Sequence, residues 1–164
     1  MVFLLLQTGT ARADTPTDPH VASAGVTISG DVDTVRAVTR DAVHTCPRRT
    51  EVVTFHTPAG PQTHSYLGCP LEALIAPSLP RTDEVAAHPL LTVAVVARGA
   101  DGYEATLSWA ELSPDLAARP ALVAWTQDEV SLQRPRLVVP ADLGGSRYVS
   151  DLTDLRVVQL ASPR

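Results

Sequence analysis

The stretch EVVTFHTPAGPQTHSYL, residues 51–67, decides the fold that the sequence predicts. Residues 51–56 are rich in β-branched and aromatic side chains, and residues 62–67 alternate by side-chain type. The sequence Pro58-Ala59-Gly60-Pro61 between them has the composition of a turn. We therefore expect residues 51–67 to form a β-hairpin.

The flanking segments predict further short strands and short helices. On the N-terminal side we expect a strand and turn around Gly30, and either a short helix or a second strand over residues 35–43. Pro70 suits the start of a short helix, and Ser108-x-x-Glu111 suits a capping box at the start of another. Patterns typical of strands cover residues 91–97, 103–107, 123–125, 137–140 and 154–160. The sum is a β-rich α+β domain with mostly antiparallel pairs.

Length and composition fit one globular domain. A chain of 164 residues can bury a sufficient core without a metal, and with only 4% aromatic residues that core must consist largely of Val, Leu and Ala. Residues 14–24 are polar and lack periodicity, which predicts a disordered leader. We place the domain at residues 25–162.

Charge and motifs exclude several functions. The net charge of -5 and the lack of a basic stripe argue against nucleic acid as a partner. The chain has no Gly-x-Ser-x-Gly elbow, no His-Glu-x-x-His helix and no glycine-rich loop before a lysine. The common signatures of hydrolases, zinc proteases and nucleotide-binding proteins are therefore absent.

The N-terminus predicts export. Residues 2–6 are apolar, and Ala11-Arg12-Ala13 reads as a cleavage site, so we interpret residues 1–13 as a signal-peptide remnant. The alternative is a frayed apolar tail. No other stretch approaches the ~20 apolar residues of a membrane span, so we expect none after cleavage.

Two cysteines fit an exported protein with one disulfide. Cys46 precedes the first strand of the hairpin and Cys69 follows the second, so antiparallel pairing brings them near each other. The register leaves this pairing open, because Cys46 lies upstream of the position facing Cys69 unless residues 47–49 fold back.

Residues 142–148 (DLGGSRY) have the composition of an anion site. The backbone N–H groups of Gly144 and Gly145 can converge on a ligand, and Arg147 supplies a fork of donors. In the alternative interpretation this is an ordinary turn, with Arg147 exposed or paired to Asp142 or Asp151.

A metal site would require the two histidines of the hairpin to face each other. His56 and His64 could then supply two ligands, but no third ligand is evident. Two polar side chains on a solvated face are the favoured interpretation.

Several segments, in their order and spacing, resemble one family. They are QTHSYLG at residues 62–68 with Pro70-Leu71, Gly102-Tyr103, VAW at 123–125, RLVVP at 136–140 and GGSRYV at 144–149. From about residue 25 onward the chain is similar to the molybdopterin-binding domain of the sulfite-oxidase-like oxidoreductases, and its length fits their small exported bacterial members. The resemblance implies their β-rich fold and a pocket for molybdopterin or another anionic small molecule. The residues we expect to contact that ligand are Arg147, Gly144, Gly145, Tyr103 and His64.

One position departs from the catalytic members of that family. Thr57 stands where they carry a cysteine that ligates molybdenum. A threonine hydroxyl is a weakly acidic ligand that cannot replace a thiolate on this metal, so we expect no molybdenum and a binding or accessory role. Two alternatives stay open, namely an active molybdopterin-dependent oxidoreductase and a structural domain without a ligand.

Overall fold

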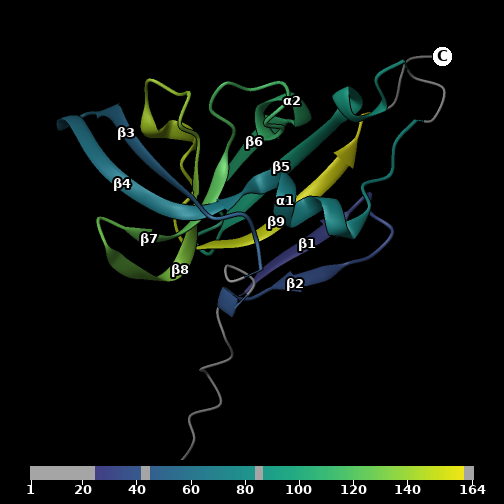
Figure 1. Cartoon of the computed structure of the whole chain (residues 1–164), viewed down its shortest axis with the longest axis horizontal. Helices are drawn as coiled ribbons and strands as arrows, with labels where there is room; N and C mark the ends of the chain where they lie inside the picture. Colours follow the sequence, from purple (N-terminus) through teal and green to yellow (C-terminus); the bar gives the residue numbers. More distant parts are fainter. Residues whose placement is uncertain (1–24, 42–44, 84–86, 161–164) are drawn as a thin grey trace, which may run out of the picture.

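The computed structural model describes residues 25–41, 45–83 and 87–160, which form two β-sheets with short helices (Figure 1). The first sheet has the strand order β2-β1-β9-β5-β6 and the second has the order β3-β4-β7-β8. Every pair is antiparallel except β1 with β9, which is parallel. The expected β-rich α+β fold is confirmed.

The strands and helices are short. The strands are β1 (Val26–Gly30), β2 (Arg36–Val38), β3 (Arg49–Thr57), β4 (Gly60–Pro70), β5 (Val93–Gly99), β6 (Glu104–Ser108), β7 (Leu122–Gln127), β8 (Val130–Val138) and β9 (Leu152–Gln159). The helices are α1 (Leu71–Ile75) and α2 (Trp109–Leu112), and the 3-10 turns are η2 (Ala76–Ser78), η3 (Pro89–Thr92) and η4 (Gly145–Arg147).

The central hairpin lies where the sequence predicts it. Strands β3 and β4 run together as a long ribbon beside β7 and β8 (Figure 1). Val53 pairs with His64, and Thr57 pairs with Gly60 across the turn. Gly60 has φ +109°, a backbone conformation that favours glycine. The turn residues therefore fix the register of the hairpin.

Several other strands and helices also form where the sequence pattern predicts them. Within residues 35–43 the chain forms a strand, β2, that pairs with β1, so the strand alternative holds there. Ser108 donates its backbone N–H to Glu111 Oε2 at 2.8 Å, and this capping box starts α2. Residues 42–44, 1–24 and 161–162 lie outside the described residues, and with them the signal-peptide remnant and the leader.

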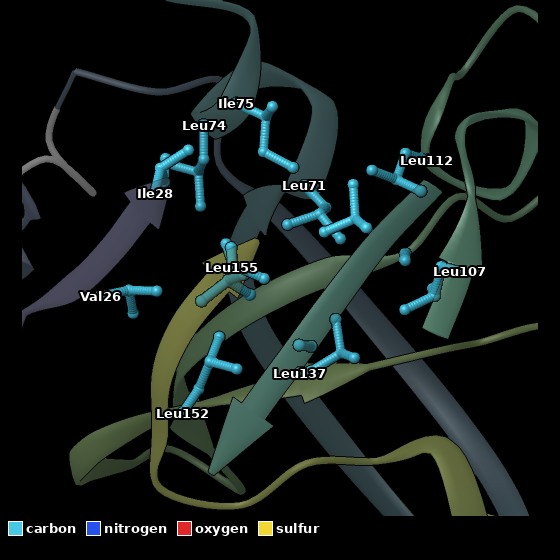
Figure 2. Close-up of a cluster of buried hydrophobic side chains, with 14 of the residues drawn as sticks. Val26, Ile28, Leu71, Leu74, Ile75, Leu107, Leu112, Leu137, Leu152 and Leu155 are labelled. Carbon is cyan, nitrogen blue, oxygen red and sulfur yellow. The ribbon is translucent and has the colours of Figure 1, made fainter. Parts of the chain in front are cut away.

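The main core joins both sheets and the two α-helices. Aliphatic side chains dominate it, as the low aromatic content predicts, and Figure 2 shows Ile28, Leu71 and Leu155 among them. A second cluster lies on the other face of the four-stranded sheet and includes Val53 and Phe55. Tyr148 packs against both clusters. The segment between β8 and β9 therefore covers the outer face of the hairpin sheet.

A disulfide joins Cys46 to Cys69, with their Cα atoms 5.9 Å apart. This distance lies within the ~7 Å that a disulfide can bridge. Cys69 is fully buried near the end of β4, so the bond ties the segment before β3 to the sheet. Among the described residues, no helix is long and apolar enough to cross a membrane.

Candidate functional site

The end of β3 and the turn after β8 form one cavity. Its volume is about 380 Å³, and its walls come from residues 55–58 and 144–146. Two of the segments singled out in the sequence, the Thr57 position and the Gly144-Gly145 turn, therefore lie side by side. They are 87 residues apart in the chain (144 − 57), and only the fold brings them together.

Backbone pairing holds the two walls together. The His56 N–H donates to the Leu143 carbonyl oxygen at 2.9 Å, and His56 and Gly144 form an isolated parallel bridge. The described walls contain no carboxylate, and His56 is their single titratable side chain. An anion in the cavity would therefore meet backbone, hydroxyl groups and one imidazole.

The two glycines of the turn have different surroundings. A Cβ on Gly145 would lie 2.8 Å from Cδ2 of Phe55, so close packing against this ring requires glycine there. A Cβ on Gly144 would meet nothing closer than the His56 carbonyl oxygen at 4.0 Å. Gly144 also has φ -121°, which any residue can adopt. Gly145 is therefore constrained by packing, and neither glycine is required by a positive φ.

Thr57 uses its hydroxyl inside the hairpin turn. The hydroxyl donates to the Gly60 carbonyl oxygen at 2.9 Å and accepts the Ala59 N–H at 3.2 Å. Both bonds stabilise the turn between β3 and β4. Thr57, at the position where the catalytic members carry a cysteine, thus lines the cavity, while its hydroxyl oxygen is hydrogen-bonded to the backbone of the turn.

Arg147 does not line the cavity, and its guanidinium is bound by two carboxylates. Nε and Nη2 donate to the two oxygens of Asp142 at 2.9 and 2.5 Å, and Nη1 donates to Glu111 Oε1 at 2.6 Å. The bonds to Asp142, against the opposing effect of burial, raise the pKa of Arg147 above its usual range. The guanidinium that we expected to bind a ligand anion is therefore hydrogen-bonded to carboxylates of the protein itself. The expectation of a free guanidinium was wrong.

Glu111 is a site residue that the sequence marks only as a helix cap. Burial by itself would raise the pKa of Glu111, but hydrogen bonds from the Ser108 backbone and from the Arg147 and Ser108 side chains outweigh it. The pKa of Glu111 therefore lies below its usual value. No local pattern indicates the contact with Arg147, because the two residues are 36 positions apart.

Tyr103 also lies outside the walls of the cavity. Its hydroxyl donates to the carbonyl oxygen of Ser146, one of the wall residues, and nearly half of its surface is exposed. The bond connects the start of β6 to the 144–146 turn. Tyr103 therefore contacts the site from outside rather than facing a ligand.

His64 lies behind Phe55 rather than in the cavity. Its Nδ1 is 2.6 Å from Asp128 Oδ2, and its ring centroid is 5.9 Å from that of Phe55. In the β3–β4 register His64 pairs with Val53 and His56 pairs with Pro61, which places the two histidines on opposite faces of the hairpin. They cannot share a metal, and among the described residues no cluster of three His, Cys, Asp or Glu side chains could hold one.

The wall residues that lie outside the segments expected to bind a ligand are Phe55 and Pro58. Phe55 carries the clearest physical role, because its ring packs between Gly145 and the Tyr148 ring, whose centroid is 4.7 Å away. The β-strand pattern marks Phe55 as a core residue but gives no sign of a cavity beside it.

The chain shares its fold with part of a solved dehydrogenase structure. The solved structure of the sulfane dehydrogenase SoxCD from Paracoccus pantotrophus matches 82% of this chain with a TM-score of 0.64 and 17% sequence identity. The chain spans 38% of that neighbour. At this identity the likeness is one of fold. No family model matches the chain, and no curated protein matches it.

Proposed function

We propose that this chain is an exported domain of the sulfite-oxidase-like kind that binds molybdopterin or another anionic small molecule without molybdenum, and acts as a binding or accessory module. The observation that carries the proposal is the cavity where the Thr57 position meets the Gly144-Gly145 turn. The fold shared with SoxCD supports the choice of a pterin. The cavity of about 380 Å³ falls within the ~300–1,000 Å³ of typical small-molecule sites.

The ligand contacts in this proposal come from the cavity walls. Gly144, Gly145 and Ser146 offer backbone and hydroxyl groups to a phosphate, and His56 adds an imidazole N–H. Arg147 and Tyr103 act as positioning residues, because their hydrogen bonds hold the turn that forms one wall. His64 supports the opposite wall through the Phe55 ring.

The donor set around the cavity does not fit molybdenum. The hydroxyl of Thr57 is bonded within the hairpin turn, and Cys46 and Cys69 are joined to each other. No thiolate is therefore available at the walls. Metal analysis of protein purified from a molybdenum-replete host tests this part, and stoichiometric molybdenum would favour an active oxidoreductase.

A cavity-filling variant tests the ligand site. We expect Gly144→Val to weaken binding of a pterin phosphate at least about tenfold by occupying open space at the wall, with the melting temperature unchanged. Ala37→Val adds the same kind of bulk to an exposed position of β2 and should leave binding intact. If wild type binds no pterin phosphate at millimolar concentration, the structural-domain alternative replaces the proposal.

Export is tested separately from ligand binding. The Ala11-Arg12-Ala13 pattern predicts cleavage after Ala13. The intact mass of protein recovered from the envelope or medium of its host should correspond to a chain beginning at Asp14. A secreted or envelope form that retains Met1 would contradict the cleavage.

A further inference from the structure

A second and larger cavity lies between α1, α2 and η3. Its volume is about 800 Å³. It shares no lining residue with the cavity at the Gly144-Gly145 turn, so an inference about it goes beyond the proposed function. We call it the α1/α2 groove, and its walls are Glu72, Pro80, Thr82, Ala87, His88, Pro89, Leu90, Leu91, Trp109, Ser113, Asp115 and Leu116.

Much of the groove wall is apolar yet open to solvent. Leu90, Leu91 and Leu116 have exposed fractions of 38%, 47% and 58%, and Trp109 from the core contributes to the same wall. Clustered exposed apolar side chains beside a cavity are typical of a binding surface. The groove is therefore suited to an apolar body of small-molecule size.

The charged side chains described in the wall of the groove are acidic. Among the described wall residues, Glu72 and Asp115 are carboxylates, none is a lysine or arginine, and His88 is the remaining titratable group. Neither carboxylate is paired with a basic side chain of the described residues. A cation in the groove would be attracted and an anion would be repelled.

One carboxylate oxygen is buried without a hydrogen bond. Glu72 Oε2 is shielded from solvent and accepts no hydrogen bond from any described residue. A carboxylate with a buried oxygen that lacks a donor is costly, so the Glu72 carboxylate gains from a charged N–H donor that reaches it from the groove. The aromatic ring of Trp109 in the same wall adds a second attraction for a cation.

We infer that the α1/α2 groove binds a small organic cation, an ammonium compound with an apolar body. The ammonium group pairs with the Glu72 carboxylate, with Asp115 contributing to the negative field. The apolar body lies against the leucines of η3 and the Trp109 wall. The volume and the apolar walls suit the apolar body, and the two carboxylates favour a cation over an anion.

A pair of probes with matching bodies tests the inference. We expect 2-phenylethylammonium to bind the wild-type protein at least about tenfold more tightly than 3-phenylpropionate, measured by amide and indole shifts in NMR titrations. Glu72→Gln preserves the shape of the side chain and should remove this preference, and Asp115→Asn should reduce it. Glu104→Gln changes a carboxylate on β6 that pairs with Arg98 and should have no effect.

Four results would overturn the inference. Equal binding of the two probes, no binding of either, or an undiminished preference in Glu72→Gln would each exclude the cation site. Dimerisation in sedimentation experiments that Leu91→Ser abolishes would assign the groove to a second copy of the chain instead. Unchanged melting temperatures of the variants would show that the losses do not come from unfolding.

Discussion

Arg147 and Asp142 are joined by two parallel hydrogen bonds, from Nε to Oδ2 at 2.9 Å and from Nη2 to Oδ1 at 2.5 Å. Glu111 accepts a third bond from Nη1 at 2.6 Å. These contacts connect the 142–147 segment to helix α2. The guanidinium therefore stabilises the turn that forms one wall of the cavity.

Removing this guanidinium should cost stability. Arg147→Ala leaves two partly buried carboxylates without their partner, and we expect the free energy of unfolding to fall by about 1–3 kcal/mol. Urea unfolding of the variant and of wild type measures the difference. Arg81→Ala, which removes an exposed ion pair with Asp33, should cost less than about 1 kcal/mol and serves as the control. A fully stable Arg147→Ala protein would contradict the structural role.

The pKa of Glu111 gives this network a defined pH dependence. Because the pKa is lowered on folding, ionised Glu111 contributes stability that is present above its ordinary value of 4.5 and is lost as pH falls through the folded value. The difference in unfolding free energy between wild type and Glu111→Gln should therefore be constant from pH 7 down to about 5 and shrink at lower pH. If the difference in unfolding free energy grew as the pH fell, the pKa of Glu111 would not be lowered on folding.

Neighbouring glycines should respond differently to the same change. Gly145→Ala places a methyl group 2.8 Å from the Phe55 ring, and we expect a loss of about 1–3 kcal/mol from overpacking. Gly144→Ala enters open space with a permissive backbone and should leave stability unchanged or raise it by up to about 1 kcal/mol. Thermal unfolding of the pair measures the contrast, and equal effects would contradict the packing at Gly145.

The disulfide should stabilise the fold through the unfolded chain. It closes a loop with a sequence separation of 23 residues, which corresponds to about 3 kcal/mol. We expect reductant to lower the melting temperature of wild type and to leave a Cys46→Ala/Cys69→Ala variant unaffected. Equal melting temperatures of wild type with and without reductant, after mass spectrometry confirms reduction, would contradict this contribution.

Most of the strands can be predicted from the sequence, because the alternation and the turn residues that define a strand lie close together in the chain. The hairpin over residues 51–67 follows from β-branched residues on either side of Pro58-Ala59-Gly60-Pro61, and the register at Gly60 follows from its turn chemistry. The parallel pairing of β1 with β9 has no such local signal, because the two strands lie at opposite ends of the described chain.

The candidate site could be predicted only in part. Thr57 and the Gly144-Gly145 turn were each singled out, yet their meeting in one cavity depends on long-range packing. The sequence is compatible with two roles for Arg147, namely binding a ligand and pairing with Asp142. In the structure Arg147 is paired with Asp142. No sequence motif marks the α1/α2 groove, since its walls come from three separate short elements and the loops beside them.

Amide chemical-shift mapping tests the central proposal most directly. A pterin phosphate is titrated into the wild-type protein, and the shifts of every assigned amide are followed by NMR. We predict saturable changes concentrated at residues 55–57 and 144–146, with smaller changes for the unphosphorylated pterin. No change at millimolar ligand, or changes confined to other surfaces, would contradict a ligand site at the Gly144-Gly145 turn.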